Sequence, residues 1–149
     1  MLTPDQAWDG AARVAGALAA LGAEPGDRVA FVATPCEDLV VAALGASASG
    51  VVPVVLNPGL LPHERDVLVR DAEPIMVIGD GELPGLLAGA PIELADVPLV
   101  RPMHYTSGTS GRAKGVYGGV LDHDAAWAAV LDEREVWDFG PDDAYLAAG

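Results

Sequence analysis

The chain has 149 residues and a formal net charge of −14, which excludes a basic face broad enough for general nucleic-acid or anionic-membrane binding. Hydrophobic residues make up 51% of it but aromatic residues only 5%, which favours helix and sheet layers packed through Ala, Val and Leu. A single cysteine excludes an internal disulfide, and no stretch has the pattern of a secretory signal or a membrane span. We therefore expect one cytoplasmic domain.

The first part of the chain alternates helix and strand. Thr3, Pro4 and Gln6 predict a helix start with a capping box, and apolar residues then recur at helical spacing as far as Gly22. Residues 28–33 read as a buried strand. The capping-box pattern recurs in 34–37 (TPCE) and predicts a helix to about residue 49, followed by a strand over 51–56.

The second part continues the same alternation. The expected elements are a helix over 61–71, a strand over 74–78, a short helix over 85–89, a strand or hairpin return over 116–120, a helix over 125–137 capped by Asp122, and a strand over 143–146. The strands are almost continuously apolar, which is typical of a sheet covered on both faces. The predicted fold is therefore α/β, a mostly parallel sheet flanked by helices. Three tryptophans on helix faces, Trp8, Trp127 and Trp137, are expected in the core.

Residues 105–115 (YTSGTSGRAKG) differ in composition from the rest of the chain. They contain three glycines, four Ser or Thr hydroxyls and Lys114, the only lysine of the protein. Glycine allows positive φ and close backbone approach, so successive N–H groups can converge on an anion while hydroxyls and a lysine add donors and charge. The composition predicts a phosphate-binding loop.

The charge distribution supports this interpretation. No Asp or Glu occurs between Val97 and Leu121, although the chain has 22 acidic residues. The same interval holds Arg101, Arg112 and Lys114, together with His104. The loop thus lies in a locally positive part of an acidic protein, as expected of a segment that attracts a polyanion.

The loop does not follow the two common nucleotide-binding patterns. Two residues separate Gly111 from Lys114, so there is no Walker A frame, and the first strand–helix junction lacks the Gly-x-Gly-x-x-Gly spacing of a dinucleotide fold. The alternative from composition alone is a flexible Gly/Ser linker.

Residues 105–116 resemble the signature loop of the adenylate-forming superfamily, which includes acyl-CoA synthetases, firefly-type luciferases and nonribosomal peptide adenylation domains. The usual loop has Thr at the position of Ser110 and Pro at that of Ala113, and a histidine where Val120 lies in this chain. Similarity also extends over 26–30, over 46–64 and over 65–74, so it covers nearly all of the chain.

The resemblance implies a function for residues 1–149. They would form the first, N-terminal subdomain of an AMP-forming ligase that activates a small carboxylic acid as acyl-AMP, releases pyrophosphate and transfers the acyl group to CoA, as in fatty acid metabolism. ATP, as its Mg²⁺ complex, would be bound through its phosphates by seven loop residues: Thr106, Ser107, Gly108, Thr109, Ser110, Gly111 and Lys114.

The residues that in this family bind adenine, ribose and Mg²⁺, and the C-terminal catalytic lysine, have no counterpart in this sequence. We therefore expect no catalytic residue here, and an N-terminal fragment that is inactive alone. Two alternatives remain: a non-catalytic phosphate- or nucleotide-binding module, and a structural half that assembles with a separate C-terminal partner or as a homo-oligomer.

Other polar residues give weaker signals. Cys36 is expected in the first turn of a helix, where a thiolate is favoured, but a structural role is the simpler interpretation. His63 and His123 lack a second ligand at metal-binding spacing, so no metal site is expected. His104 either adds charge near the loop or bonds a backbone carbonyl.

Overall fold

The computed structural model describes residues 2–106 and 113–138. Within them the chain forms five helices and five strands, in the order α1 (Pro4–Ala20), β1 (Arg28–Val32), α2 (Glu37–Ala48), β2 (Val52–Leu56), α3 (Pro62–Ala72), β3 (Met76–Gly79), α4 (Leu83–Leu87), β4 (His104–Thr106), β5 (Lys114–Val116) and α5 (His123–Trp137).

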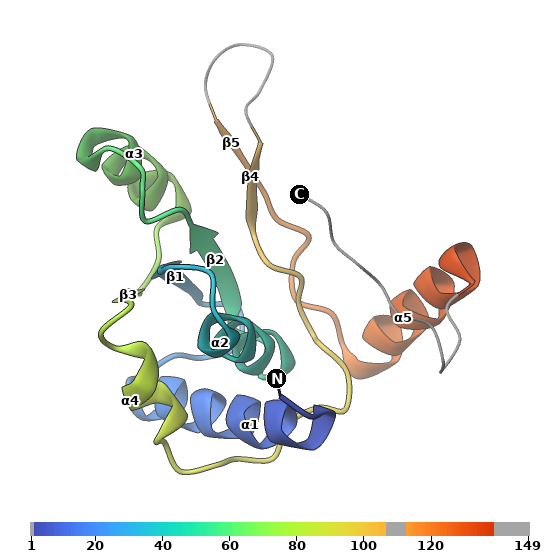
Figure 1. Ribbon diagram of the computed structural model, residues 1–149. Helices are drawn as coiled ribbons and strands as arrows, with labels where there is room; N and C mark the ends of the chain where they lie inside the picture. The colour runs from blue at the N-terminus through green and yellow to red at the C-terminus, as the bar shows by residue number, and fades with distance from the viewer. Residues whose placement is uncertain (1, 107–112, 139–149) are drawn as a thin grey trace.

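The centre of the fold is a three-stranded parallel sheet in the order β2-β1-β3 (Figure 1). In this sheet Phe31 of β1 lies beside Val55 of β2 and Ile78 of β3. Because parallel strands need crossover connections, α2 links β1 to β2 and α3 links β2 to β3. The predicted α/β class with a parallel, helix-flanked sheet is confirmed.

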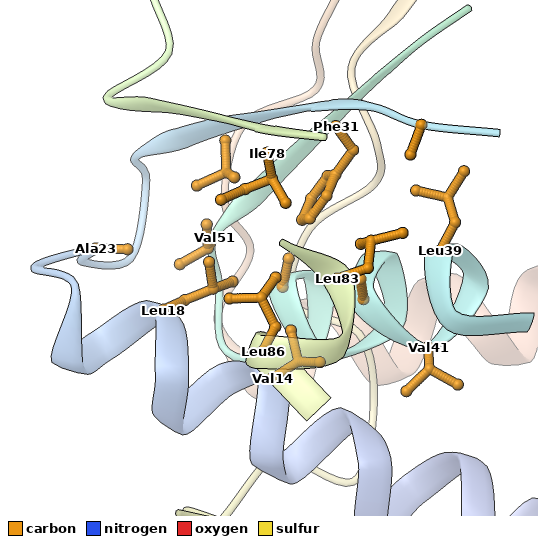
Figure 2. Close-up of a cluster of buried hydrophobic side chains, with 14 residues drawn as sticks. Val14, Leu18, Ala23, Phe31, Leu39, Val41, Val51, Ile78, Leu83 and Leu86 are labelled. Atoms are coloured by element: carbon orange, nitrogen blue, oxygen red, sulfur yellow. The ribbon is translucent and has the colours of Figure 1, made fainter. Parts of the chain in front are cut away.

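One face of the sheet is covered by α1, α2 and α4, and most of the core lies there (Figure 2). Val29 and Phe31 of β1 point to this face and are fully buried against Val14 and Leu18 of α1. Leu83 of α4 closes the same cluster. The alternation of side chains along a strand explains why Val29 and Phe31 share this layer.

The opposite face is covered by α3 and by the chain around β4. Ala30, which lies between Val29 and Phe31, points to this side and is buried with Val54 of β2, Ala72 of α3 and Met103. This second, smaller cluster joins the sheet to the segment that carries the predicted phosphate loop.

Local signals located most helix starts correctly. The capping box at Thr3 is present, with the Thr3 hydroxyl accepting from the Gln6 N–H at 3.2 Å and the Gln6 side chain accepting from the Thr3 N–H at 2.9 Å. Asp122 caps α5 by accepting from the Ala125 N–H at 2.8 Å.

The predicted cap at Thr34 is wrong. The N–H and hydroxyl of Thr34 both donate to the carboxylate of Asp80, which follows β3, at 2.7 and 3.1 Å. Helix α2 begins at Glu37 with Cys36 as its N-cap, and the Cys36 side chain makes no cap bond. Thr34 therefore ties together two strand ends instead of starting the helix.

The tryptophans were expected in the core, and this expectation is also wrong. Trp8, Trp127 and Trp137 are 36%, 44% and 68% exposed.

The return strand after the loop is β5, which begins earlier than the expected 116–120. The strand expected at 143–146 lies outside the described residues. No helix in residues 2–106 and 113–138 is long and apolar enough to cross a membrane.

Candidate functional site

Strands β4 and β5 form an antiparallel hairpin that projects away from the rest of the fold (Figure 1). Its last paired residues are Thr106 and Lys114, which lie opposite each other. The two ends of the predicted phosphate loop are thereby brought together. The other five predicted site residues, Ser107, Gly108, Thr109, Ser110 and Gly111, lie outside the described residues.

The hairpin keeps one register along its length. His104 pairs with Val116, and further from the loop Val100 and Val120 form an antiparallel bridge in the same alignment. Antiparallel pairing between the two arms thus recurs below the short ladder, and it supports the loop from both sides.

Met103 joins this hairpin to the parallel sheet. It forms a parallel bridge with Val54 of β2, and its N–H donates to the Pro53 carbonyl at 2.9 Å. Because the two segments run in the same direction, β4 carries the chain past Leu56, the last residue of β2. The loop therefore starts beyond the carboxyl edge of the sheet, where ligands bind in open α/β folds.

Tyr105 anchors the hairpin to α3. Its hydroxyl lies 3.0 Å from the Leu68 carbonyl and 2.9 Å from Oδ2 of Asp71, both on α3. Partial burial and the hydrogen bond to Asp71 raise the pKa of Tyr105 above its ordinary value, so the hydroxyl keeps its proton and acts as the donor. The sequence placed Tyr105 in the loop motif but assigned it no role, because its partners are more than thirty residues away.

Gly115, opposite Tyr105, allows the two arms of the hairpin to pack closely. A Cβ at this position would lie 2.2 Å from Cε of Met103 and 3.4 Å from both Oδ2 of Asp71 and Cε1 of Tyr105. The end of the flexible Met103 side chain occupies this space, so Gly115 gives Met103 room at the base of the loop, a role distinct from binding a phosphate.

A second anchor lies on the returning arm. The guanidinium of Arg28, the first residue of β1, stands 5.6 Å from the ring centroid of Tyr117, a distance typical of a cation–π contact. The same Arg28 donates to the Ala72 carbonyl at the end of α3 at 2.7 Å. Both arms of the hairpin thus contact the region where α3 ends.

The charges of the acid-free interval have different roles. Arg101 forms an exposed ion pair with Glu133 of α5. Lys114 is exposed, and no ion pair joins it to another described residue. His104 is also exposed, on the strand that leads into the loop. Arg112 lies outside the described residues, and among the described residues of the interval Lys114 is the cation best placed to meet a phosphate.

The weaker candidates do not form a site. Cys36 is exposed and free. Nε2 of His123 pairs with Asp96 at 2.6 Å, an interaction that holds the start of α5. Residues 2–106 and 113–138 contain no group of three His, Cys, Asp or Glu side chains suited to a metal ion.

Comparison with known proteins identifies relatives. Residues 1–102 match the family model described as AMP-binding enzyme. The p-hydroxybenzoic acid–AMP ligase FadD22 of Mycobacterium tuberculosis (strain H37Rv) is 30% identical over 132 residues, covering 76% of this chain and 19% of that protein. Tyrocidine synthase 3 of Brevibacillus parabrevis is 29% identical over 168 residues, covering 97% of this chain and 2% of that protein.

A solved structure also resembles this chain in fold. The crystal structure of MatB from Rhodopseudomonas palustris superimposes with a TM-score of 0.74 at 28% identity, over 95% of this chain and 34% of that one. The chain thus spans about a third of MatB and a smaller share of the two curated relatives. The matched family region ends just before β4, and it includes the whole parallel sheet. The chain belongs to the AMP-binding enzyme family.

Proposed function

We propose that residues 1–149 form the N-terminal part of an adenylate-forming ligase, which uses ATP to activate a carboxylic acid as acyl-AMP with release of pyrophosphate. The observation that carries this proposal is the pairing of Thr106 with Lys114 at the base of a Gly/Ser/Thr loop, beyond the carboxyl edge of the sheet. Membership of the AMP-binding family supports it, and so does the likeness to MatB, which has been solved with ATP bound.

In this proposal the loop binds the β- and γ-phosphates of ATP. Backbone N–H groups and the hydroxyls of Thr106, Ser107, Thr109 and Ser110 donate to phosphate oxygens, while Gly108 and Gly111 permit close approach. Lys114 neutralises charge that builds up as pyrophosphate leaves. Mg²⁺ arrives with ATP as part of the substrate.

The thiol that accepts the acyl group is a more specific part of the proposal. We propose CoA, so that the second half-reaction forms a thioester. The relatives include both an acid–AMP ligase and tyrocidine synthase 3, and the competing acceptor in our proposal is the thiol of a carrier protein. The substrate is a small carboxylic acid in either case.

Acid-dependent exchange of radiolabelled pyrophosphate into ATP tests the first half-reaction. The protein that carries this chain would be incubated with Mg·ATP and a panel of short-chain, dicarboxylic, aromatic and amino acids. Exchange that requires one class of acid supports the proposal, and adding CoA or a carrier protein then identifies the acceptor. Mg·ATP binding without exchange for any acid would contradict it and favour a non-catalytic nucleotide-binding module, while exchange that needs a second polypeptide would identify a two-chain enzyme.

A further inference from the structure

We infer that the Tyr105 hydroxyl and the Asp71 carboxylate form a clamp that sets the position of the phosphate loop, which makes both of them positioning residues for ATP. The inference rests on the proposed function. It assigns to α3, which carries none of the predicted loop residues, a part in holding the loop in place.

The hairpin needs such support because its own pairing is short. Each arm contributes three residues to the ladder next to the loop, and a two-stranded hairpin alone is at best marginally stable in water. Its orientation must therefore come from contacts with the body of the fold. The clearest of these are the Met103 bridge to β2, the Tyr117 contact with Arg28, and the bonds of Tyr105 to α3.

Among these contacts, the Tyr105 bonds lie closest to the loop. Tyr105 directly precedes Thr106, the first predicted phosphate-binding residue, and lies opposite Gly115, which follows Lys114. A movement of the Tyr105 backbone would therefore displace both ends of the loop. Since the ring is tethered at its far end, the hydroxyl bonds limit such movement.

Asp71 contributes through its bond to Tyr105. Its Oδ2 lies 2.9 Å from the Tyr105 hydroxyl, and it also faces Gly115 on the returning arm, where an added Cβ would lie 3.4 Å from it. The phenol has one hydrogen to share between Asp71 and the Leu68 carbonyl, and a carboxylate is the stronger acceptor. Asp71 thus comes from α3 to lie beside the hairpin, whose own sequence contains no acidic residue. Its role there is to accept the hydrogen bond from Tyr105.

The two hairpin tyrosines provide a matched test. Tyr105→Phe removes the tethered hydroxyl and keeps the ring, while Tyr117→Phe makes the same change on the opposite arm, where the hydroxyl has no hydrogen-bond partner among the described residues. Asp71→Ala and the double variant Tyr105→Phe/Asp71→Ala complete a double-mutant cycle.

Two measurements on the protein that carries this chain decide the matter. Amide hydrogen exchange at residues 104–106 and 114–116, without nucleotide, reports whether the clamp orders the hairpin. The kinetics of acid-dependent ATP–pyrophosphate exchange report the KM for Mg·ATP separately from the KM for the acid. We expect Tyr105→Phe and Asp71→Ala to speed hairpin exchange and to raise the KM for ATP about three- to tenfold, as for the loss of one hydrogen bond. The KM for the acid should stay unchanged, the double variant should be no worse than either single one, and Tyr117→Phe should behave as the unsubstituted protein.

Three results would overturn the inference. Equal rates of amide hydrogen exchange at the hairpin in Tyr105→Phe and Tyr117→Phe would show that the Tyr105 hydroxyl does not order the hairpin. Faster amide hydrogen exchange in Tyr105→Phe and Asp71→Ala, with an unchanged KM for ATP, would show that the clamp does not position the loop. Additive losses in the double variant would show that Tyr105 and Asp71 act separately. Absence of any ATP-dependent activity in the unsubstituted protein would contradict the proposed function instead, and hydrogen exchange would still decide the clamp.

Discussion

The crossing of α1 and α2 gives the sharpest prediction on stability. Gly45 of α2 lies against the backbone of α1, and a Cβ added there would be 2.4 Å from the Ala11 carbonyl oxygen and 3.0 Å from Cβ of Val14. The Ala11 oxygen belongs to a helical backbone and cannot rotate away. Replacing Gly45 by Ala therefore forces the two helices apart.

The size of the effect follows from these distances. Ordinary van der Waals contact begins near 3.4 Å, so the helices must separate by about 1 Å at this point. Overpacking of this kind typically costs about 1–3 kcal/mol, and the higher helix propensity of Ala returns up to about 1 kcal/mol. Because the clash is with a backbone atom, the upper part of that range, about 2–3 kcal/mol, applies, and we expect Gly45→Ala to lower the free energy of unfolding by about 1–2 kcal/mol.

Urea unfolding followed by circular dichroism measures this difference. With a typical slope, the midpoint should fall by roughly 0.5–1 M. Gly85→Ala in α4 is the matched control, because a Cβ at Gly85 meets nothing within 4 Å and should leave stability unchanged or slightly raised. Equal midpoints for the two variants would refute the close packing of α1 on α2.

Two further predictions concern α5. Asp122→Ala removes the cap bond to the Ala125 N–H and should destabilise the helix by about 1 kcal/mol, whereas Asp122→Asn should not; equal helicity of the two variants by circular dichroism would contradict this. The hydrogen bond to Asp96 raises the pKa of His123 above its ordinary value, so the interaction stabilises the fold below that ordinary pKa and is lost as the pH rises through the raised value. NMR titration should show a lower His123 pKa in Asp96→Asn, and an unchanged pKa would exclude Asp96 as the cause.

Local sequence signals predicted the parts of the fold that depend on neighbouring residues. The capping box at Thr3 involves residues three positions apart and was predicted correctly. The same pattern at Thr34 failed because Asp80, far along the chain, takes both donors of Thr34. Apolar strand composition predicted a parallel sheet because its central strand β1 is buried on both faces, although Val55 of β2 and Val77 of β3 stay exposed.

The candidate site divides in the same way. Composition and the family resemblance predict the phosphate loop from Thr106 to Lys114, since its chemistry is contained in one segment, and this remains a prediction. The support of the loop could not be predicted, because the bond from Tyr105 to Asp71 and the bridge from Met103 to Val54 join residues that only the fold brings together. The exposed position of Trp137 was likewise invisible, since helical periodicity does not say which face is covered.

The most direct test of the central claim compares two variants that each remove one positive charge. Lys114→Ala alters the predicted phosphate loop, while Arg13→Ala removes a surface pair with Asp9 on α1 and should have little effect. Acid-dependent ATP–pyrophosphate exchange by the protein that carries this chain is the measurement. We predict a loss of at least about tenfold for Lys114→Ala, corresponding to about 1.4 kcal/mol of transition-state stabilisation, and no change for Arg13→Ala. Equal exchange rates for the two variants would contradict a role of this loop in binding the phosphates of ATP.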